Sequence, residues 1–336
     1  MEKLILGLWN QMSIMNSKTK GVVLISILLV VLLLSAVAVT FGNKYLLSLK
    51  RSQYIDFQSL SLNSFRNIES LSYRIIDDEY RFNSKKLSKN NPILNNQIYF
   101  NFDNTEIIGN ISDASNCFNI NSMVLLKDGN YLENTETINA FRRLMNSFDI
   151  EDNLIEEIID QIIDWIDKDS NPRTYGLEDY YYSGPLHNPR EYSGMRLFIS
   201  IDELKSIPAV KNMEWQIFKN HFCALPSNTN LSFNINTLTK KDDLLLSSIY
   251  PNIDIADAEY IIDNIPMEGF ENNDNLQKAF PEFDFSLSYG NIAFTSKIFK
   301  LNTIIKSDDF SASSQSIINY ENNKNSYIIS RIYNGI

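Results

Sequence analysis

A long uncharged run near the start of the chain limits the architecture most. Residues Gly21–Gly42 read GVVLISILLVVLLLSAVAVTFG. About 20 apolar residues in a helix cross a bilayer, so this run predicts a transmembrane segment and is too long for a signal-peptide core. Lys18 and Lys20 before it favour a cytoplasmic flank, although three basic residues within 44–51 weaken that charge difference. We therefore expect a single-pass membrane protein.

Composition and charge argue against several functional classes. The net charge of −11 disfavours nucleic-acid binding, which needs clustered Lys and Arg. Two His (His187 and His221) and two Cys (Cys117 and Cys223) do not by themselves build a Cys/His zinc site. The 11 Gly form neither GxGxxG nor GxxxxGK followed by Ser or Thr, the two glycine motifs that bind phosphate groups. We interpret both histidines as surface or hydrogen-bonded polar residues.

The apolar run is expected to continue as a long helix. Neither Gly nor Pro occurs between Gly42 and Pro92, so nothing interrupts a helix there. Apolar residues recur at helical spacing, which predicts an amphipathic stem to about Tyr80. They are Leu60, Phe65, Ile68, Leu71, Ile75 and Ile76.

The stem and the residues before it resemble type IV pilins and pseudopilins. The residues that carry the resemblance are Lys18-Thr19-Lys20-Gly21, followed at once by Val22-Val23-Leu24-Ile25-Ser26. The resemblance implies cleavage by prepilin peptidase between Gly21 and Val22, and N-methylation of Val22. Most members have Glu as the fifth mature residue, whereas this chain has Ser26. A carboxylate in the bilayer costs roughly 2.5–3.5 kcal/mol and is retained where it neutralises a neighbour's amine, so a subunit without it is expected at the fibre tip.

The remaining residues are expected to form a sheet interrupted by helices. Ile98–Phe102 alternates apolar and polar residues, and 103–105 turns the chain into Glu106–Ile111, as in a hairpin. Strand patterns return only in Ala293–Ile305 and Tyr327–Tyr333, with Ser- and Asn-rich loops expected between them.

Two helices are clear in the intervening region. One carries an apolar stripe that must pack on a core, formed by Ile155, Ile158, Ile159, Ile162, Ile163 and Ile166. The other covers Asp254–Ile265, with Asp254 as a candidate N-cap.

Five ordered motifs resemble the minor pseudopilin K family of type II secretion systems. They are Cys117-Phe118-Asn119-Ile120-Asn121, Ile163-Asp164-Trp165-Ile166-Asp167-Lys168-Asp169, Tyr175-Gly176-Leu177-Glu178-Asp179, Glu203-Leu204-Lys205-Ser206-Ile207-Pro208-Ala209-Val210 and Phe233-Asn234-Ile235-Asn236-Thr237. The fourth motif has Ala209 where the family has Gly. The D-W-I-D-x-D and G-x-E-D motifs disfavour the related alternative, a type IV pilus minor pilin.

The resemblance implies an α+β, pilin-like fold: a long N-terminal transmembrane and stem α-helix plus an antiparallel β-sheet, with a large α-helical domain inserted in the sheet. The expected parts are a prepilin leader (1–21), a transmembrane segment (22–42), an amphipathic stem helix (43–82), a first sheet part (95–121), an inserted SAM-like or helix-hairpin-helix-like domain (122–288) and a second sheet part (289–336).

The implied function is structural and not enzymatic. The resemblance implies a subunit at the pseudopilus tip that initiates the fibre and supports protein export. Its implied partners are I- and J-type minor pseudopilins, other pseudopilins, prepilin peptidase and the inner-membrane secretion platform. It would be anchored in the inner membrane with its C-terminal bulk in the periplasm. The alternative from the residues alone is a signal-anchored periplasmic enzyme or binding protein that uses the acidic loop 164–179.

That loop is a candidate cation site. Its five carboxylates are those of Asp164, Asp167, Asp169, Glu178 and Asp179. Calcium takes six to eight oxygen ligands and tolerates irregular loops, and the family resemblance also implies calcium sites in this region. The alternatives are a solvated acidic loop with helix N-caps, or a general acid–base pair, which needs two carboxylates in unlike environments.

The two cysteines each precede an F-N-I-N sequence, Cys117 directly and Cys223 by ten residues. A periplasmic location is oxidising, so a Cys117–Cys223 disulfide is one interpretation and two buried thiols the other. The Asn residues of both F-N-I-N segments are candidates for bonds to backbone groups at strand ends, although four residues do not establish a repeat. Leu204–Val210 also resembles a helix-hairpin-helix turn, but it lacks the second Gly and lies among acidic residues, so no DNA binding is expected.

Overall fold

The computed structural model contains two units, Met1–Leu62 and Asn63–Ile336. The described residues are 2–102, 104–185, 190, 192–211, 213–225, 229–307, 309–321 and 326–336, with side chains from residue 22 onward. The side chains of the predicted leader, residues 1–21, therefore lie outside the described part.

The first unit is helical from Glu2 and belongs to α1 (Glu2–Phe82). Between Val22 and Phe41 its apolar side chains are exposed. The helix Val22–Phe82 contains a segment long and apolar enough to cross a membrane. Apolar side chains exposed at this density are unfavourable in water, so residues 22–42 suit a bilayer as the sequence predicts.

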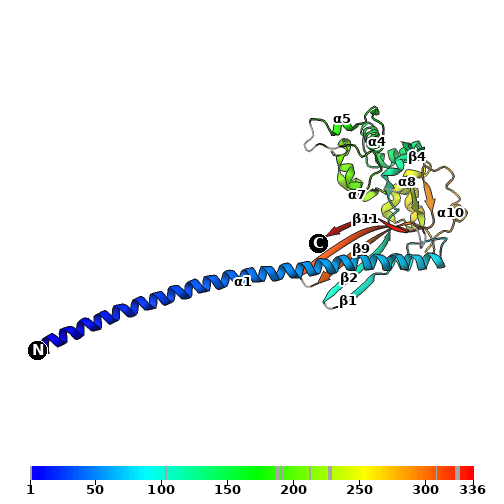
Figure 1. Cartoon of the computed structure of the whole chain (residues 1–336). Helices are drawn as coiled ribbons and strands as arrows, with labels where there is room; N and C mark the ends of the chain where they lie inside the picture. The colour runs from blue at the N-terminus through cyan, green and yellow to red at the C-terminus, as the bar shows by residue number, and fades with distance from the viewer. Residues whose placement is uncertain are drawn as a thin grey trace. The chain divides into compact units, whose positions relative to one another are not determined.

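The second unit is built on a five-stranded antiparallel sheet in the order β1-β2-β9-β10-β11. The strands are β1 (Ile98–Phe102), β2 (Thr105–Asp113), β9 (Ile298–Ser307), β10 (Phe310–Asn319) and β11 (Tyr327–Asn334). In Figure 1 these strands lie along the C-terminal part of α1, and the helices of the insertion gather beyond one end of the sheet. The expected α+β fold with a helical insertion in the sheet is confirmed.

The prediction of loops between Ile305 and Tyr327 is wrong in part, because Phe310–Asn319 forms β10. Ser residues conceal its alternation, since the alternating buried positions are Ala312, Ser314, Ser316 and Ile318, with Asn319 also buried at the strand end. The predicted hairpin is confirmed: β1 and β2 pair antiparallel. Its Asp103 lies outside the described residues.

The sheet contacts α1 through a close approach and a buried ion pair. A Cβ at Gly109 would lie 3.0 Å from Ile68 Cγ2, so glycine lets β2 come close to the helix. The buried carboxylate of Glu69 accepts hydrogen bonds from Arg331 Nε (2.9 Å) and Nη2 (3.0 Å) of β11 and from Ser316 Oγ (2.6 Å) of β10. Bidentate arginine contacts and a hydroxyl offset the cost of burying this charge.

The helical insertion lies between β2 and β9. Its helices are α3 (Thr135–Asn146), α4 (Asp152–Ile166), α5 (Asp179–Tyr182), α6 (Pro208–Lys211), α7 (Trp215–His221), α8 (Asp243–Ile249), α9 (Ile255–Asp263) and α10 (Asn273–Ala279). Short elements complete it: β4 (Val124–Lys127), β5 (Asn130–Glu133), and the 3-10 helices η1 (Ile120–Met123), η2 (Ile201–Ser206), η3 (Ile235–Thr237) and η4 (Lys240–Asp242). A short helix, α2 (Pro92–Asn95), precedes the sheet.

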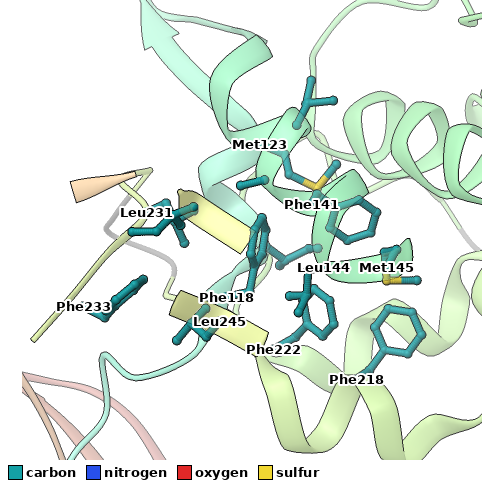
Figure 2. Packing of buried hydrophobic residues seen from close by; sticks show 14 of the residues in the cluster. Phe118, Met123, Phe141, Leu144, Met145, Phe218, Phe222, Leu231, Phe233 and Leu245 are labelled. Atoms are coloured by element: carbon teal, nitrogen blue, oxygen red, sulfur yellow. The ribbon is translucent and has the colours of Figure 1, made fainter. Parts of the chain in front are cut away.

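The core of the insertion is aromatic and aliphatic. Phe118, Phe141 and Phe222 form a triangle with ring centroids 5.4–5.7 Å apart, as Figure 2 shows. The predicted isoleucine stripe of α4 is buried in the same core. Asp254 caps α9 as expected, in a capping box with Asp257.

The boundaries of the insertion differ from the expected 122–288. Phe118–Asn119 is not part of the large sheet but forms β3, which pairs in parallel with β6 (Phe222–Cys223). Likewise β8 (Asn291–Ala293) pairs in parallel with β7 (Ser232–Asn234). Both β3 and β8 fall within the expected sheet parts 95–121 and 289–336, because their parallel partners lie far away in the sequence and no local pattern identifies the pairing. The large sheet itself ends at Asp113 and resumes at Ile298.

Asp113, the last residue of β2, links the sheet to the insertion. Its Oδ1 accepts hydrogen bonds from Ser115 N (2.8 Å) and Ser115 Oγ (2.6 Å). Its Oδ2 accepts hydrogen bonds from Thr237 Oγ1 (2.7 Å) and Ser296 Oγ (2.5 Å). One carboxylate therefore fixes the exit from β2, the turn at η3 and the return toward β9.

The first F-N-I-N segment binds distant backbone through its second asparagine. Asn119 Oδ1 accepts a hydrogen bond from Asn121 N at 3.3 Å and caps η1. The Asn121 side chain accepts a hydrogen bond from Phe198 N (2.8 Å) and donates one to Phe198 O (2.9 Å). We call this two-way pairing of an amide side chain with one residue's backbone the amide clamp.

The second F-N-I-N segment repeats these contacts. Asn234 Oδ1 accepts a hydrogen bond from Asn236 N at 3.0 Å and caps η3. The Asn236 side chain makes the same amide clamp with Phe270, accepting from its N (2.7 Å) and donating to its O (2.8 Å). The two segments therefore share the cap and the amide clamp as well as their sequence, but they differ in other contacts: Asn119 Oδ1 also accepts a hydrogen bond from Leu225 N at 3.1 Å, whereas Asn236 Nδ2 also donates one to Phe294 O at 3.0 Å.

The structure joins Cys117 and Cys223 in a disulfide, with their Cα atoms 5.7 Å apart. The bond lies beside the β3–β6 pairing, in which Asn119 is opposite Cys223. It therefore closes the chain segment that contains α3 to α7.

Replacing both cysteines (Cys117→Ala, Cys223→Ala) should lower the free energy of unfolding by about 4–5 kcal/mol in the chain-entropy view of a long closed loop. Urea denaturation of the detergent-solubilised full chain measures this loss. Reductant should reproduce the loss in the wild type and leave the double variant unchanged. Alkylation of both thiols without reduction would contradict the bond.

Candidate metal centre

The acidic loop starts at the C-terminal end of α4, whose isoleucines face the core. Asp160, Asp164 and Asp167 follow at helical spacing on a neighbouring face. Asp167 is the C-cap of α4, and Glu178 is the N-cap of the short helix α5. The loop between the two caps returns the chain to the helix end, which brings their carboxylates near each other.

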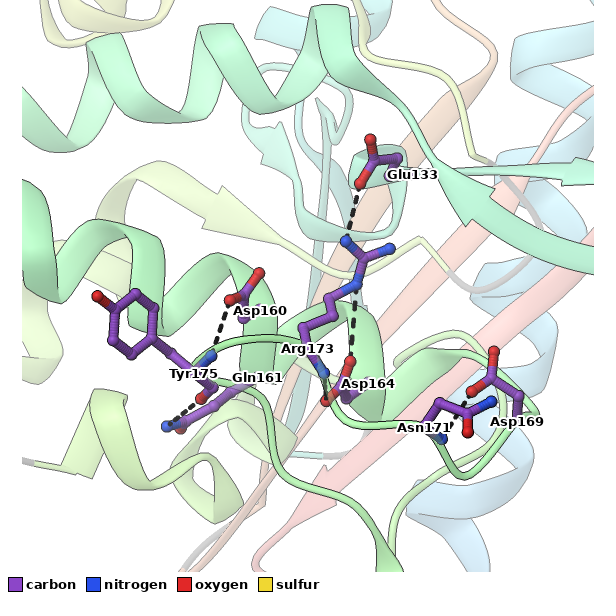
Figure 3. A network of polar contacts seen from close by, with 8 residues as sticks. All are labelled: Glu133, Asp160, Gln161, Asp164, Asp169, Asn171, Arg173 and Tyr175. Carbon is purple, nitrogen blue, oxygen red and sulfur yellow. Dashed lines mark hydrogen bonds and ion pairs between the residues drawn. The ribbon is translucent and has the colours of Figure 1, made fainter.

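The structure brings together three of the five predicted carboxylates. Oxygens of Asp167, Asp169 and Glu178 all lie within 4.8 Å of one another. Asp167 and Glu178 are buried, with 9% and 2% of their surfaces exposed, whereas Asp169 is exposed. One oxygen of Asp169 accepts a hydrogen bond from Asn171 N at 2.8 Å (Figure 3). We call these three residues the acidic cluster.

Two oxygens in the cluster are buried without a hydrogen-bond partner. They are Oδ1 of Asp167 and Oε1 of Glu178. Buried polar atoms are nearly always hydrogen-bonded, and a buried charged group without compensation is strongly unfavourable. Buried oxygens without partners, on carboxylates that approach one another within 4.8 Å, fit a bound cation.

The pKa values of both buried carboxyl groups are raised. Burial raises the pKa of Asp167 to about 7, with repulsion from Asp169 and Asp164 adding to the effect. Burial, followed by repulsion from Asp164 and the cluster, raises the pKa of Glu178 to about 7. The charged forms are unfavourable until a cation compensates them.

Asp164 contacts Arg173 and does not belong to the acidic cluster. It is fully buried, and its Oδ2 accepts a hydrogen bond from Arg173 N at 3.1 Å, while Arg173 Nε lies 3.6 Å from its Oδ1 (Figure 3). Burial outweighs this arginine and raises the pKa of Asp164 to about 6. A Cβ at Gly176 would lie 1.8 Å from Asp164 Oδ2, so a glycine is needed where the loop passes over this carboxylate.

Asp179 also has a protein partner. Its Oδ1 accepts hydrogen bonds from Ser193 N (2.8 Å) and Ser193 Oγ (2.7 Å). The carboxylate thus fixes the chain after α5, and the structure does not bring it into the acidic cluster.

Sequence reasoning missed two supporting residues. Asp160 Oδ2 accepts a hydrogen bond from Tyr175 N at 3.0 Å, and Arg173 contacts Asp164 as described. The available signals were the helical spacing of Asp160 from Asp164 and the presence of an arginine in an otherwise acidic loop. The spacing of residues along the chain does not show which carboxylate that arginine contacts.

The chemistry of the cluster suits a hard cation. Carboxylate oxygens in an irregular loop are the ligands that calcium prefers. An acid–base pair needs two carboxylates with pKa values pushed apart, whereas those of Asp167 and Glu178 are both about 7. The residues present therefore fit calcium better than acid–base catalysis.

The remaining candidate residues lie elsewhere. His221 packs on Phe148 with ring centroids 5.0 Å apart, and burial lowers its pKa. His187 lies outside the described residues. In the segment that resembles a helix-hairpin-helix, Ala209 N donates a hydrogen bond to Gln161 Oε1 at 2.9 Å, so this amide is used inside the protein.

We predict that metal-free protein loses stability as the pH rises. Asp167 and Glu178 have folded pKa values of about 7 and unfolded values of about 4, so the folded state binds more protons between these limits. The free energy of unfolding then falls from about pH 4 to about pH 7. Thermal melts in chelator across this range measure the fall, and calcium should remove it near neutral pH. The control is Asp167→Asn with Glu178→Gln, and an unchanged pH profile in that variant would contradict the assignment.

The comparisons with known proteins agree with one another. Residues 116–227 match the family model described as type II secretion system (T2SS), protein K. Type II secretion system protein K of Aeromonas hydrophila is 26% identical over 268 residues, which cover 78% of this chain and 80% of that protein. The putative type II secretion system protein K of Escherichia coli K12 is 26% identical over 261 residues, or 77% and 79% of the two chains.

The fold is shared with a solved structure. A chain in the crystal structure of the GspK–GspI–GspJ complex from the enterotoxigenic E. coli type 2 secretion system matches with a TM-score of 0.70 and 20% identity, covering 85% of this chain and 99% of that one. The matched family region contains the acidic cluster, the first amide clamp residue Asn121 and the disulfide. Over most of its length the chain is therefore similar to type II secretion system protein K, and it shares its pilin-like fold with a chain of the GspK–GspI–GspJ complex.

Proposed function

We propose that this protein is the minor pseudopilin at the tip of a type II secretion pseudopilus, where it initiates the fibre and supports protein export. The observation that carries the proposal is the helical insertion between β2 and β9. In a helical fibre each subunit is covered by the next one, so a domain of this size fits where no subunit follows. This position is the tip.

The first residues of the apolar helix support the same position. Ser26, the fifth residue after the proposed cleavage site, donates a hydrogen bond from its Oγ to Val23 O at 2.8 Å in its own helix. It offers no carboxylate to the N-terminal amine of another subunit. Because a carboxylate is retained in a bilayer only where it is compensated, its absence suits a subunit with no neighbour above it.

The proposed assembly route starts in the inner membrane. Prepilin peptidase cuts between Gly21 and Val22 and methylates Val22, and the apolar segment 22–42 then holds the subunit by one pass with its bulk in the periplasm. I- and J-type minor pseudopilins bind it, the fibre grows with other pseudopilins below it, and the secretion platform drives extraction. The match in fold to the K subunit of a GspK–GspI–GspJ complex supports these partners.

Calcium is proposed as the ion of the acidic cluster. Asp167, Asp169 and Glu178 would supply carboxylate oxygens, and the two buried oxygens without partners support this role. Calcium would neutralise the local charge and stabilise the loop between α4 and α5. No reaction at the cluster is proposed.

If this protein lies at the tip, it should be found at only one end of each isolated fibre. Immunogold labelling with antibody against the helical insertion should mark one end of each pseudopilus in electron micrographs, because one subunit starts each fibre. An antibody against the major pseudopilin serves as the control and should label the whole length. Labelling of the K-type subunit along the fibre would contradict a tip role.

Processing predicts a defined mature N-terminus. Intact mass and N-terminal sequencing should find a chain that starts at methylated Val22 only when prepilin peptidase is co-expressed. Gly21→Val should block cleavage, because the residue before the cut changes, whereas the matched glycine variant Gly42→Val should be cut normally. A chain that starts at Met1 with active peptidase would exclude the pseudopilin route.

A further inference from the structure

The hairpin β4–β5 depends on outside contacts for its order. It forms a sheet of two strands only, with Leu125 opposite Leu132. The side chains of Leu125, Leu126 and Leu132 are 44–59% exposed. A two-stranded hairpin is marginally stable by itself in water, and these leucines leave about half of their surface exposed. Contacts from other elements must therefore hold the hairpin in place.

Contacts at the turn and along β5 come from the acidic loop. Lys168 Nζ donates a hydrogen bond to Gly129 O at 3.2 Å and lies 5.9 Å from the ring centroid of Tyr131. Arg173 Nη1 donates a hydrogen bond to Glu133 Oε2 at 2.8 Å, as Figure 3 shows. We call these contacts the latch.

The latch residues belong to the segment that forms the acidic cluster. Lys168 lies between Asp167 and Asp169, both members of the cluster. Arg173 is held by Asp164, which accepts a hydrogen bond from its backbone N at 3.1 Å. A backbone movement that separates Asp167 from Asp169 therefore moves Lys168 as well.

Repulsion supplies the force for such movement. Asp167, Asp169 and Glu178 lie within 4.8 Å of one another, and the two buried oxygens have no hydrogen-bond partner that would hold them there. Like charges at this separation in a poorly solvated site repel strongly. A cation among them removes the repulsion, so the loop keeps the geometry that places Lys168 over the hairpin.

We propose that the acidic cluster controls the order of the β4–β5 hairpin through the latch. When the cluster holds its cation, Lys168 and Arg173 fix the hairpin and its exposed leucines in one position. When the cluster is empty, the loop opens and the hairpin frays. This inference rests on the proposed calcium site, and Lys168 and Arg173 are positioning residues in it, not ligands.

Hydrogen–deuterium exchange on the full chain in detergent tests the proposal. Peptides that cover the hairpin and peptides that cover 164–180 are followed in calcium and in chelator. Calcium should slow hairpin exchange by at least about tenfold, since a latch that adds about 1.4 kcal/mol to local stability changes opening by that factor. Terbium luminescence, competed by calcium, reports binding at the cluster independently.

A latch variant separates this inference from the calcium site itself. Lys168→Met with Glu133→Ala removes the contacts to the hairpin and leaves the three cluster carboxylates intact. Terbium binding should persist while calcium no longer slows hairpin exchange. The matched control is Lys205→Met with Asp202→Ala. Lys205 likewise combines an ion pair with a ring contact, to Asp202 at 2.5 Å and to the Trp215 ring at 4.4 Å, away from the cluster. The control should behave as the wild type.

Two results would contradict the coupling between the acidic cluster and the hairpin without contradicting the calcium site. In the first, calcium protects 164–180 in the wild type and leaves hairpin exchange unchanged. In the second, the latch variant keeps the full calcium effect on the hairpin. If terbium does not bind and neither region responds to calcium, the calcium site fails and the coupling fails with it.

Discussion

The pairing of β2 with β9 is the constraint on which the rest of the second unit depends. Their register joins Thr105 to Ser307 and Asp113 to Phe299, although the whole insertion lies between the two strands. The insertion must therefore start and end at the same end of the sheet, where β2 stops and β9 begins. The Asp113 carboxylate meets this condition, because it accepts hydrogen bonds from Ser115, Thr237 and Ser296, one group from each chain segment that converges there.

Much of the fold could be predicted because its pattern is local. The isoleucine stripe of α4, the Asp254 cap and the β1–β2 hairpin follow from periodicity and capping. The strand β10 was hidden, since its buried positions include Ser314 and Ser316, whose burial depends on neighbours such as Glu69 of α1. The short parallel strands were hidden because their partners are far apart in sequence.

The acidic loop shows the same limit. Composition indicated five candidate carboxylates, but packing separates them into three roles. Asp164 contacts Arg173, Asp179 contacts Ser193, and the remaining three form the cluster. No spacing rule makes this division, because it depends on where Gly176 lets the loop cross α4 and on which backbone amides then face each carboxylate.

The two amide clamps differ in the length of chain that they enclose. Asn121 reaches Phe198 across 77 positions, whereas Asn236 reaches Phe270 across 34. The acidic cluster and the loop that latches the hairpin lie inside the longer enclosure. Each clamp uses only the N–H and C=O of a single residue, so its geometry does not depend on the length of chain that it encloses. The longer enclosure can therefore accommodate the acidic loop while Asn121 keeps the same paired contact that Asn236 makes around a segment less than half as long.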